Sequence, residues 1–282
     1  MADGAISVRS AVSFSWSLWT ANWRTIWGVL ALNSLAGTVA MAGSLALNDA
    51  LYLAGLGAAL IFSLMSDGAV FRLALADRHV GDAAFSPGPS GLQWQMIEWR
   101  MFAAKVLLGV FMAIVAMLLL VALWAVAIGV VSNNGGPVAI PMTVDALTKG
   151  LGPAGAAVVS ALVLVSLGAV VFVGVRLSLA AAATVDAGKI QVLSTWRMTR
   201  GRFWQIFFSL LLIIGPSVLV SALLGSGVHG AGTTPVQMTP SAALFSGLIL
   251  GVLSGGVMQP LIAGVLAYYC RHLRTTAPGG TT

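Results

Sequence analysis

The chain alternates between long apolar runs and short polar connections. Six runs are each at least about 20 residues long and carry few charges, which is the length that a helix needs to cross the roughly 30 Å hydrocarbon core of a bilayer. They cover residues 26–47, 51–75, 105–132, 153–181, 204–224 and 244–269. The runs are too long, and too rich in Leu and Ala, to be the short alternating strands of a membrane barrel. The pattern predicts an all-α integral membrane protein with six transmembrane helices.

Composition supports this interpretation. Of 282 residues, 59% are hydrophobic and only 8% are charged, whereas a soluble domain needs considerably more charge on its surface. Polar connections between the runs are short, so we expect a single polytopic membrane domain over residues 1–275. We expect the last residues, 276–282, to form a flexible C-terminal tail.

The positive charges are distributed unevenly between the connections. Thirteen of the 14 Lys and Arg residues precede the first run, follow the sixth, or lie in the second-to-third and fourth-to-fifth connections or in the run ends that border them, and only Lys149 falls elsewhere. Basic connections stay on the cytoplasmic side during insertion. We therefore expect a bacterial inner-membrane protein with both termini cytoplasmic. This asymmetry accounts for the +6 net charge without a nucleic-acid partner.

Tryptophans gather at the cytoplasmic ends of the runs. Trp16, Trp19, Trp23 and Trp27 are spaced three and four residues apart, which places them on one stripe of a helix. This spacing predicts an amphipathic helix lying flat in the headgroup region, followed by a turn into the first spanning helix. An aromatic belt that only anchors the chain is the simplest interpretation.

Similar stretches recur before odd-numbered runs and at the ends of even-numbered runs. The triplet Trp-Arg-Met occurs at 99–101 and again at 196–198, and "FRLALA" at 71–76 resembles "VRLSLA" at 175–180. These matches predict three pseudo-repeats, each made of an interfacial helix plus a helical hairpin. Each repeat begins and ends on the cytoplasmic side, so the repeats are parallel rather than inverted.

A basic, Trp-rich segment precedes the fifth run and is the first candidate binding site. It contains Lys189, Arg197, Arg200 and Arg202, together with Trp196 and Trp204. These cations either bind anionic lipid headgroups or an acidic partner, or act only as signals that set topology. The expected partners are membrane lipids and a second membrane or cytoplasmic protein.

Four polar side chains form a candidate site within the spanning runs: Asp67, Arg72, Arg176 and Gln259. An ionised Asp is costly at membrane depth and needs a partner. Arg72 reaches the cytoplasmic interface and is poorly placed on the same helix, so Arg176 is the expected partner of Asp67. A pair that fixes the fold and a substrate or proton site are both open interpretations.

Small residues recur in the last run, where Gly247, Gly251 and Gly255 are spaced four apart. Glycines at this spacing lie on one face of a helix and let a neighbouring helix approach closely. We interpret them as a packing face.

The sequence contains few residues and motifs of the kinds that catalysis or cofactor binding requires. Glu98 is the only glutamate, the three histidines are His79, His229 and His272, and no nucleophile-elbow, zinc-protease or phosphate-loop motif occurs. Hydrolysis on a metal requires clustered carboxylates and histidines. We therefore expect no enzyme activity, no cofactor and no metal.

The stretch "VRLSLAAAATVDAGKIQVLSTWRMTRGRFWQIF" at 175–207 resembles a bacterial six-helix family known as the membrane domain of glycerophosphoryl diester phosphodiesterase. The residues that carry the resemblance are Arg176, Asp186, Gly188, Ser194, Trp196, Thr199, Gly201 and Trp204, and Thr195 is an insertion relative to the family pattern. Tyr268, Tyr269 and Arg271 match the end of the sixth helix. The resemblance implies a membrane location and a six-helix fold, but not phosphodiesterase activity, which belongs to a separate soluble barrel.

These patterns together predict the kind of function. We expect a non-catalytic membrane module that interacts with lipid or a partner protein through a basic, Trp-rich cytoplasmic rim. The alternative is a transporter of a small molecule or an amphiphile.

Overall fold

The computed structural model describes residues 6–45, 48–86, 88–133, 144–226 and 240–275. Within these ranges every regular element is helical, and six helices are long and apolar enough to cross a membrane. The chain divides into two compact units: unit 1 comprises Met1–Lys105 and Ser178–Thr282, and unit 2 comprises Val106–Leu177. The C-terminal tail, 276–282, lies outside the described residues.

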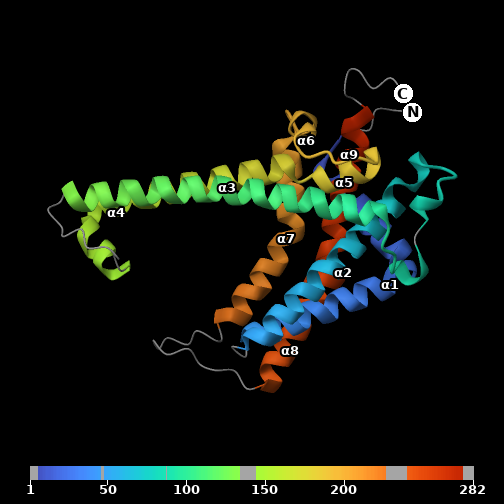
Figure 1. Ribbon diagram of the computed structural model, residues 1–282, viewed down its shortest axis with the longest axis horizontal. Helices are drawn as coiled ribbons and strands as arrows, with labels where there is room; N and C mark the ends of the chain where they lie inside the picture. The colour runs from blue at the N-terminus through green and yellow to red at the C-terminus, as the bar shows by residue number, and fades with distance from the viewer. Residues whose placement is uncertain (1–5, 46–47, 87, 134–143, 227–239, 276–282) are drawn as a thin grey trace. The chain divides into compact units, whose positions relative to one another are not determined.

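Unit 1 contains most of the helices (Figure 1). Its long elements are α1 (Val8–Leu45), α2 (Asp49–Leu75), the beginning of α3 (Met96–Asn133), α7 (Phe203–Ser226), α8 (Pro240–Gly251) and α9 (Gln259–Thr275). Two short helices, α5 (Ala180–Ala187) and α6 (Ser194–Met198), precede α7. Three 3-10 turns connect α2 to α3: η1 (Ala76–Arg78), η2 (Ala83–Phe85) and η3 (Pro89–Gly91).

Unit 2 is a helical hairpin formed by the remainder of α3 and by α4 (Val144–Leu177). Gly152, followed by Pro153, interrupts the helical backbone near the start of α4. Pro153 is compatible with a helix that restarts here. The backbone N–H groups in the first turn of a helix have no helical carbonyl to bond to, so a proline, which has no N–H, loses no hydrogen bond there.

The six apolar runs are helical, but their bounds differ from the predicted ones at several ends. Helix α1 begins at Val8 and not at residue 26, and it is one continuous helix. The four tryptophans therefore lie in a helix that continues into the first spanning run, with no break between the two. Residues 8–25 contain no Gly or Pro, so no residue in this stretch favours ending the helix. The fourth run ends four residues early, because α4 stops at Leu177.

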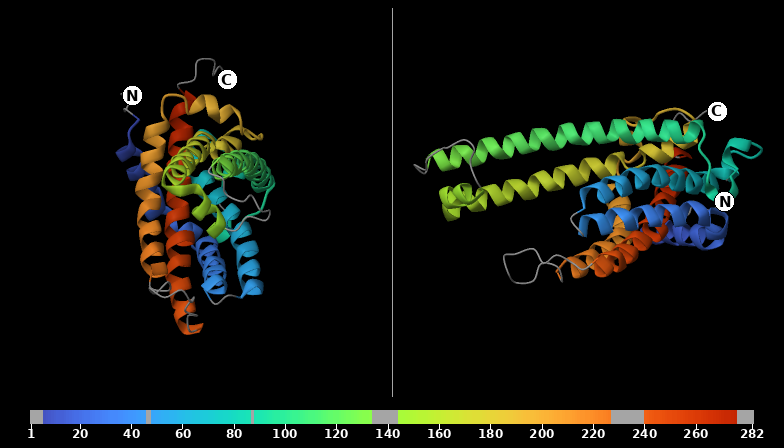
Figure 2. Two further views of the ribbon diagram at one scale, coloured as in Figure 1. Left: turned by 90° about the vertical axis from the view of Figure 1, so that its left-hand side faces the viewer. Right: turned by 60° about the horizontal axis from the view of Figure 1, so that its bottom comes forward.

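Helix α1 packs against α2 and also against the continuous stretch made of α8, a π-helical segment and α9 (Figure 2). At the crossing of α1 and α2, a Cβ on Gly55 would lie 2.7 Å from the Cα of Ala40. Only a glycine permits this approach of two backbones. Nearer the start of α1, the Ser15 hydroxyl donates to the Leu261 carbonyl of α9 at 2.6 Å.

The three glycines spaced four apart face α1. A Cβ on Gly247 would lie 2.9 Å from the Thr38 carbonyl oxygen, and one on Gly251 would lie 2.6 Å from the Ser34 carbonyl oxygen. A Cβ on Gly255 would lie 3.0 Å from Asn33. All three positions bring the backbone of the last long helix against the backbone of α1.

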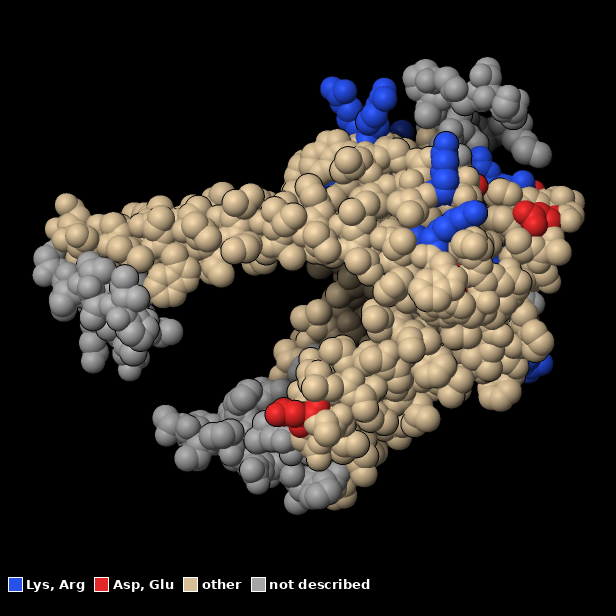
Figure 3. Space-filling model, viewed as in Figure 1, with Lys and Arg blue, Asp and Glu red and all other residues tan. Residues whose placement is uncertain are grey.

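Charged side chains are concentrated at one end of unit 1 (Figure 3). Lys and Arg gather over the end that carries α5 and α6, whereas the remaining lengths of helix on the face shown are almost uniformly uncharged. This distribution follows the segregation seen along the chain.

Candidate functional site

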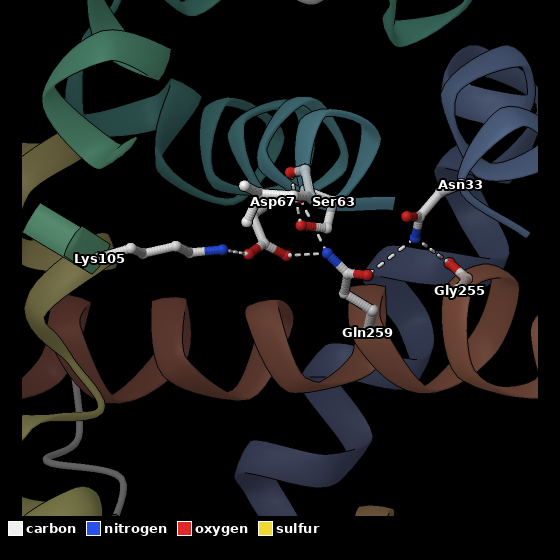
Figure 4. A network of polar contacts seen from close by, with 7 residues as sticks. Asn33, Ser63, Asp67, Lys105, Gly255 and Gln259 are labelled. Carbon is white, nitrogen blue, oxygen red and sulfur yellow. Dashed lines mark hydrogen bonds and ion pairs between the residues drawn. The ribbon is translucent and has the colours of Figure 1, made fainter. Parts of the chain in front are cut away.

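A connected chain of polar contacts crosses the interior of unit 1 (Figure 4). Lys105 Nζ lies 2.5 Å from Asp67 Oδ2, and Gln259 Nε2 donates to Asp67 Oδ1 at 3.1 Å. Gln259 Nε2 also donates to the Ser63 carbonyl at 2.8 Å, and Asn33 Nδ2 donates to Gln259 Oε1 at 2.8 Å. We call Asn33, Ser63, Asp67, Lys105 and Gln259 the polar chain. It joins α1, α2, α3 and α9.

The polar chain depends on a break in the last long helix. Residues Val252–Met258 form a π-helix, in which the Gln259 N–H donates to the Ser254 carbonyl five residues back. Pro260 has no N–H to donate. The carbonyls of Gly255 and Gly256 are therefore left without their ordinary helical donors.

Two side chains of α1 supply the missing donors. Asn33 Nδ2 donates to the Gly255 carbonyl at 3.1 Å, and the Trp19 indole N–H donates to the Gly256 carbonyl at 3.2 Å. A buried carbonyl without a partner is unfavourable, so these contacts stabilise the irregular segment. π-helical turns occur frequently at functional sites, and this one places Gln259 beside Asn33 and Asp67.

Within unit 1, Asp67 has other partners than the predicted Arg176. Asp67 pairs with Lys105 and accepts a hydrogen bond from Gln259. Arg176 belongs to unit 2, where its guanidinium lies over the ring of Phe172 at 5.2 Å. No sequence signal selects Lys105 as the partner, because this lysine stands at the beginning of the third apolar run, where a cation also sets topology.

Arg72 is held by a buried ion pair. It is fully buried, with Nη2 2.6 Å from Glu98 Oε1 and Nε donating to the Ala84 carbonyl at 2.9 Å. Glu98 is equally buried and accepts the Gln95 backbone N–H at 2.7 Å. A Glu at the third helical position that reaches back in this way is half of a capping box. Glu98 therefore fixes both Arg72 and the start of α3.

An open groove of about 700 Å³ lies beside the polar chain, between α1, α2 and the π-helical segment. Its polar side chains include Asn33, Ser63 and Gln259, and its apolar part includes Met41, Leu53 and Leu60. This volume falls within the range of about 300–1,000 Å³ that is common for small-ligand sites.

The basic, Trp-rich segment lies at the end of unit 1. Lys189, Arg197 and Arg200 are exposed and Arg202 is partly buried, with its Nη1 3.3 Å from Gln205 Oε1. Two buried threonines hold the segment, because Thr195 donates to the Val192 carbonyl and Thr199 donates to the Thr195 carbonyl. Trp204 is 64% exposed and Trp196 is 40% exposed.

The carboxylates near this end are engaged elsewhere. Asp186 lies 3.3 Å from Arg78 Nη1 and 3.3 Å from His79 Nε2, and Asp77 pairs with Arg271. Among the residues that the structure describes, no ion pair joins Lys189, Arg197, Arg200 or Arg202 to a carboxylate. The segment therefore presents a surplus of positive charge.

Metal chemistry has no support in the described ranges, where no group of three or more His, Cys, Asp and Glu side chains could hold an ion. Comparison with known proteins adds no identification: no protein-family model, curated protein or solved structure matches the chain.

Proposed function

We propose that this chain is a non-catalytic, multi-pass protein of the bacterial inner membrane that binds anionic lipid headgroups through the basic, Trp-rich segment. The observation that carries the proposal is the set of exposed cations without carboxylate partners among the described residues, flanked by exposed indoles. Indole rings favour the water–lipid boundary, and each cation near an anionic surface contributes about 1 kcal/mol of attraction.

Insertion into a membrane is supported by the exposed apolar side chains. In the most apolar 18-residue stretch between Pro89 and Asn133, 0% of the residues are buried, and in the most apolar stretch of the same length between Gly150 and Ala187 only 6% are. Water would make such surfaces prone to association, whereas lipid solvates them. The 38 residues of α1 exceed the about 20 that a spanning helix needs, which leaves part of α1 to lie in the headgroup region.

The proposal includes both termini on the cytoplasmic side, three pseudo-repeats and kinship with the six-helix family named above. Segregation of the cations supports the orientation, and the succession of three pairs of long helices, α1–α2, α3–α4 and α7–α9, supports the three repeats. Absence of catalysis is supported by Glu98, because the only glutamate is buried against Arg72 and not available as an acid or base.

A transporter of an amphiphile is the second candidate, and the π-helical break favours it. Transporters commonly bind their cargo near the middle of the membrane, at helices whose regular hydrogen bonding is interrupted. Against coupled transport, the polar chain contains one acid, Asp67, and it is already paired with Lys105.

The orientation is testable by cysteine labelling. In a Cys270→Ser background, we expect a membrane-impermeant maleimide added to intact cells or spheroplasts to modify a cysteine at Ser132 and to spare one at Ser194. Both serines are exposed, so a difference in labelling reports the side of the membrane. Modification at Ser194 with protection at Ser132 would reverse the proposed orientation.

Headgroup binding is testable with the double variant Arg197→Gln/Arg200→Gln. Phosphatidylglycerol should stabilise the wild-type protein in detergent, and the variant should lose about 2 kcal/mol of that stabilisation at low salt, at about 1 kcal/mol per cation. The loss should shrink as salt screens the charges. Thermal unfolding with and without the lipid measures it.

The matched control is Arg9→Gln/Arg24→Gln, which removes two exposed cations from α1. It should retain most of the stabilisation. If the segment variant behaves like wild type while its topology is unchanged, Arg197 and Arg200 act as topology signals only. If both variants lose the same amount, the lipid responds to overall charge and not to this segment.

A further inference from the structure

The groove between α1, α2 and the π-helical segment has a polar end whose hydrogen-bonding capacity is incompletely used. We propose that it binds a neutral, hydroxyl-bearing membrane amphiphile, with the hydroxyl donating to Asn33 Oδ1 and the hydrocarbon chain lying along Leu60 and Leu53. This inference rests on the membrane insertion proposed above but not on the headgroup site, which lies on a different part of unit 1.

The polar end offers acceptors, because its donors are already engaged. Both N–H bonds of Asn33 Nδ2 are used, one to Gly255 and one to Gln259, and both N–H bonds of Gln259 Nε2 are used, one to Ser63 and one to Asp67. The Ser63 hydroxyl donates to the Leu60 carbonyl.

The side-chain oxygen of Asn33, by contrast, accepts no hydrogen bond from any described residue, although Asn33 is only 3% exposed and lines the groove. A polar atom that faces an apolar groove at membrane depth without a hydrogen-bond partner is unfavourable. The missing partner is therefore a donor that the ligand brings, which a hydroxyl provides.

Charge balance favours a neutral ligand. Lys105 compensates Asp67, so the polar chain has no net formal charge. A charged headgroup would lie at membrane depth without a counter-charge, which is costly. Ions are therefore disfavoured at this end of the groove, in contrast to the exposed cations of the basic segment.

The position of the groove along α2 also fits an amphiphile. Ser63 is fourteen residues after Asp49 and twelve before Leu75, which places it about 21 Å and about 18 Å from the two helix ends at 1.5 Å per residue. Leu53 and Leu56 line the part toward Asp49. An apolar chain can follow this half of α2 while its hydroxyl reaches Asn33.

A photoaffinity experiment in proteoliposomes tests the inference. The probe is a long-chain primary alcohol bearing a diazirine in its chain, and labelled peptides are mapped by mass spectrometry. We expect labelling of residues 50–63. Dodecan-1-ol should compete, and its methyl ether should compete about fivefold less well, because it lacks the donor of one hydrogen bond. The ligand pair tests Asn33 without altering the protein.

Two glycine variants test the groove itself. Gly57 lines it and Gly109 lies on α3 in unit 2, and a Cβ at either position would meet nothing within 4 Å. Gly57→Trp should fill the groove and lower labelling of residues 50–63 by about tenfold, and Gly109→Trp should leave it unchanged.

Three results would overturn the inference: absence of saturable labelling in the wild-type protein, equal labelling in Gly57→Trp, or equal competition by the alcohol and the ether. The double variant Arg197→Gln/Arg200→Gln separates the two proposals, since it should lose stabilisation by phosphatidylglycerol and keep groove labelling.

Discussion

Replacing Glu98 with Leu should lower the free energy of unfolding by about 3–5 kcal/mol, which is the usual effect of removing one partner of a buried ion pair. Arg72 and Glu98 are both 0% exposed, so the variant leaves a guanidinium buried without a counter-charge. Equilibrium unfolding in mixed micelles with increasing denaturing detergent measures the change.

The double variant Arg72→Met/Glu98→Leu should recover most of this loss, because it removes the charge that was left unpaired. About 1 kcal/mol of destabilisation should remain, from the lost cap on the Gln95 N–H.

A surface ion pair provides the control. Asp77 pairs with Arg271 and has a 57% exposed side chain. The variant Asp77→Ala should therefore lower the free energy of unfolding by at most about 1 kcal/mol. Equal losses in Glu98→Leu and Asp77→Ala would show that Arg72 is not held in a buried pair.

Gly251→Leu should destabilise the protein by about 3 kcal/mol, near the upper end of the usual effect of overpacking. Its Cβ would lie 2.5 Å from the Thr38 backbone nitrogen and 2.6 Å from the Ser34 carbonyl oxygen. Backbone atoms of a packed helix cannot rotate away as a side chain can, so α1 and α8 would have to separate. Thermal unfolding in detergent measures the effect.

Gly109→Leu is the matched control, because it makes the same change in a long helix where a Cβ meets nothing within 4 Å. It should be neutral or slightly stabilising, since glycine disfavours a helix interior by about 0.5–1 kcal/mol. If the two variants unfold at the same temperature, the close contact between α1 and α8 does not contribute to stability.

The sequence predicted the helices better than their ends. Long apolar runs determine where spanning-length helices form, and all six are helical. Helix α1 begins before the first apolar run, because residues 8–25 contain no helix breaker. Tryptophan spacing identifies a helical stripe but does not indicate whether the helix ends there.

The candidate site could be predicted only in part. Asp67 and Gln259 stand out because polar side chains are rare in apolar runs, and both belong to the polar chain. Asn33 is an equally isolated amide and could have been found by the same criterion. The partners could not, because the choice of Lys105 for Asp67 and of Glu98 for Arg72 depends on which helices are neighbours.

The π-helical segment has a consequence for chain length. A π-turn holds one more residue than an α-turn, so deleting one residue within Val252–Met258 would let the α-helical hydrogen-bond pattern continue as far as Pro260. Every residue on one side of the deletion would then rotate by about 100° about the helix axis relative to the other side. Gln259 and Gly251 could no longer both face α1. Relatives of this chain with one residue fewer here should therefore lack an amide at the position of Gln259, an asparagine at that of Asn33, or both.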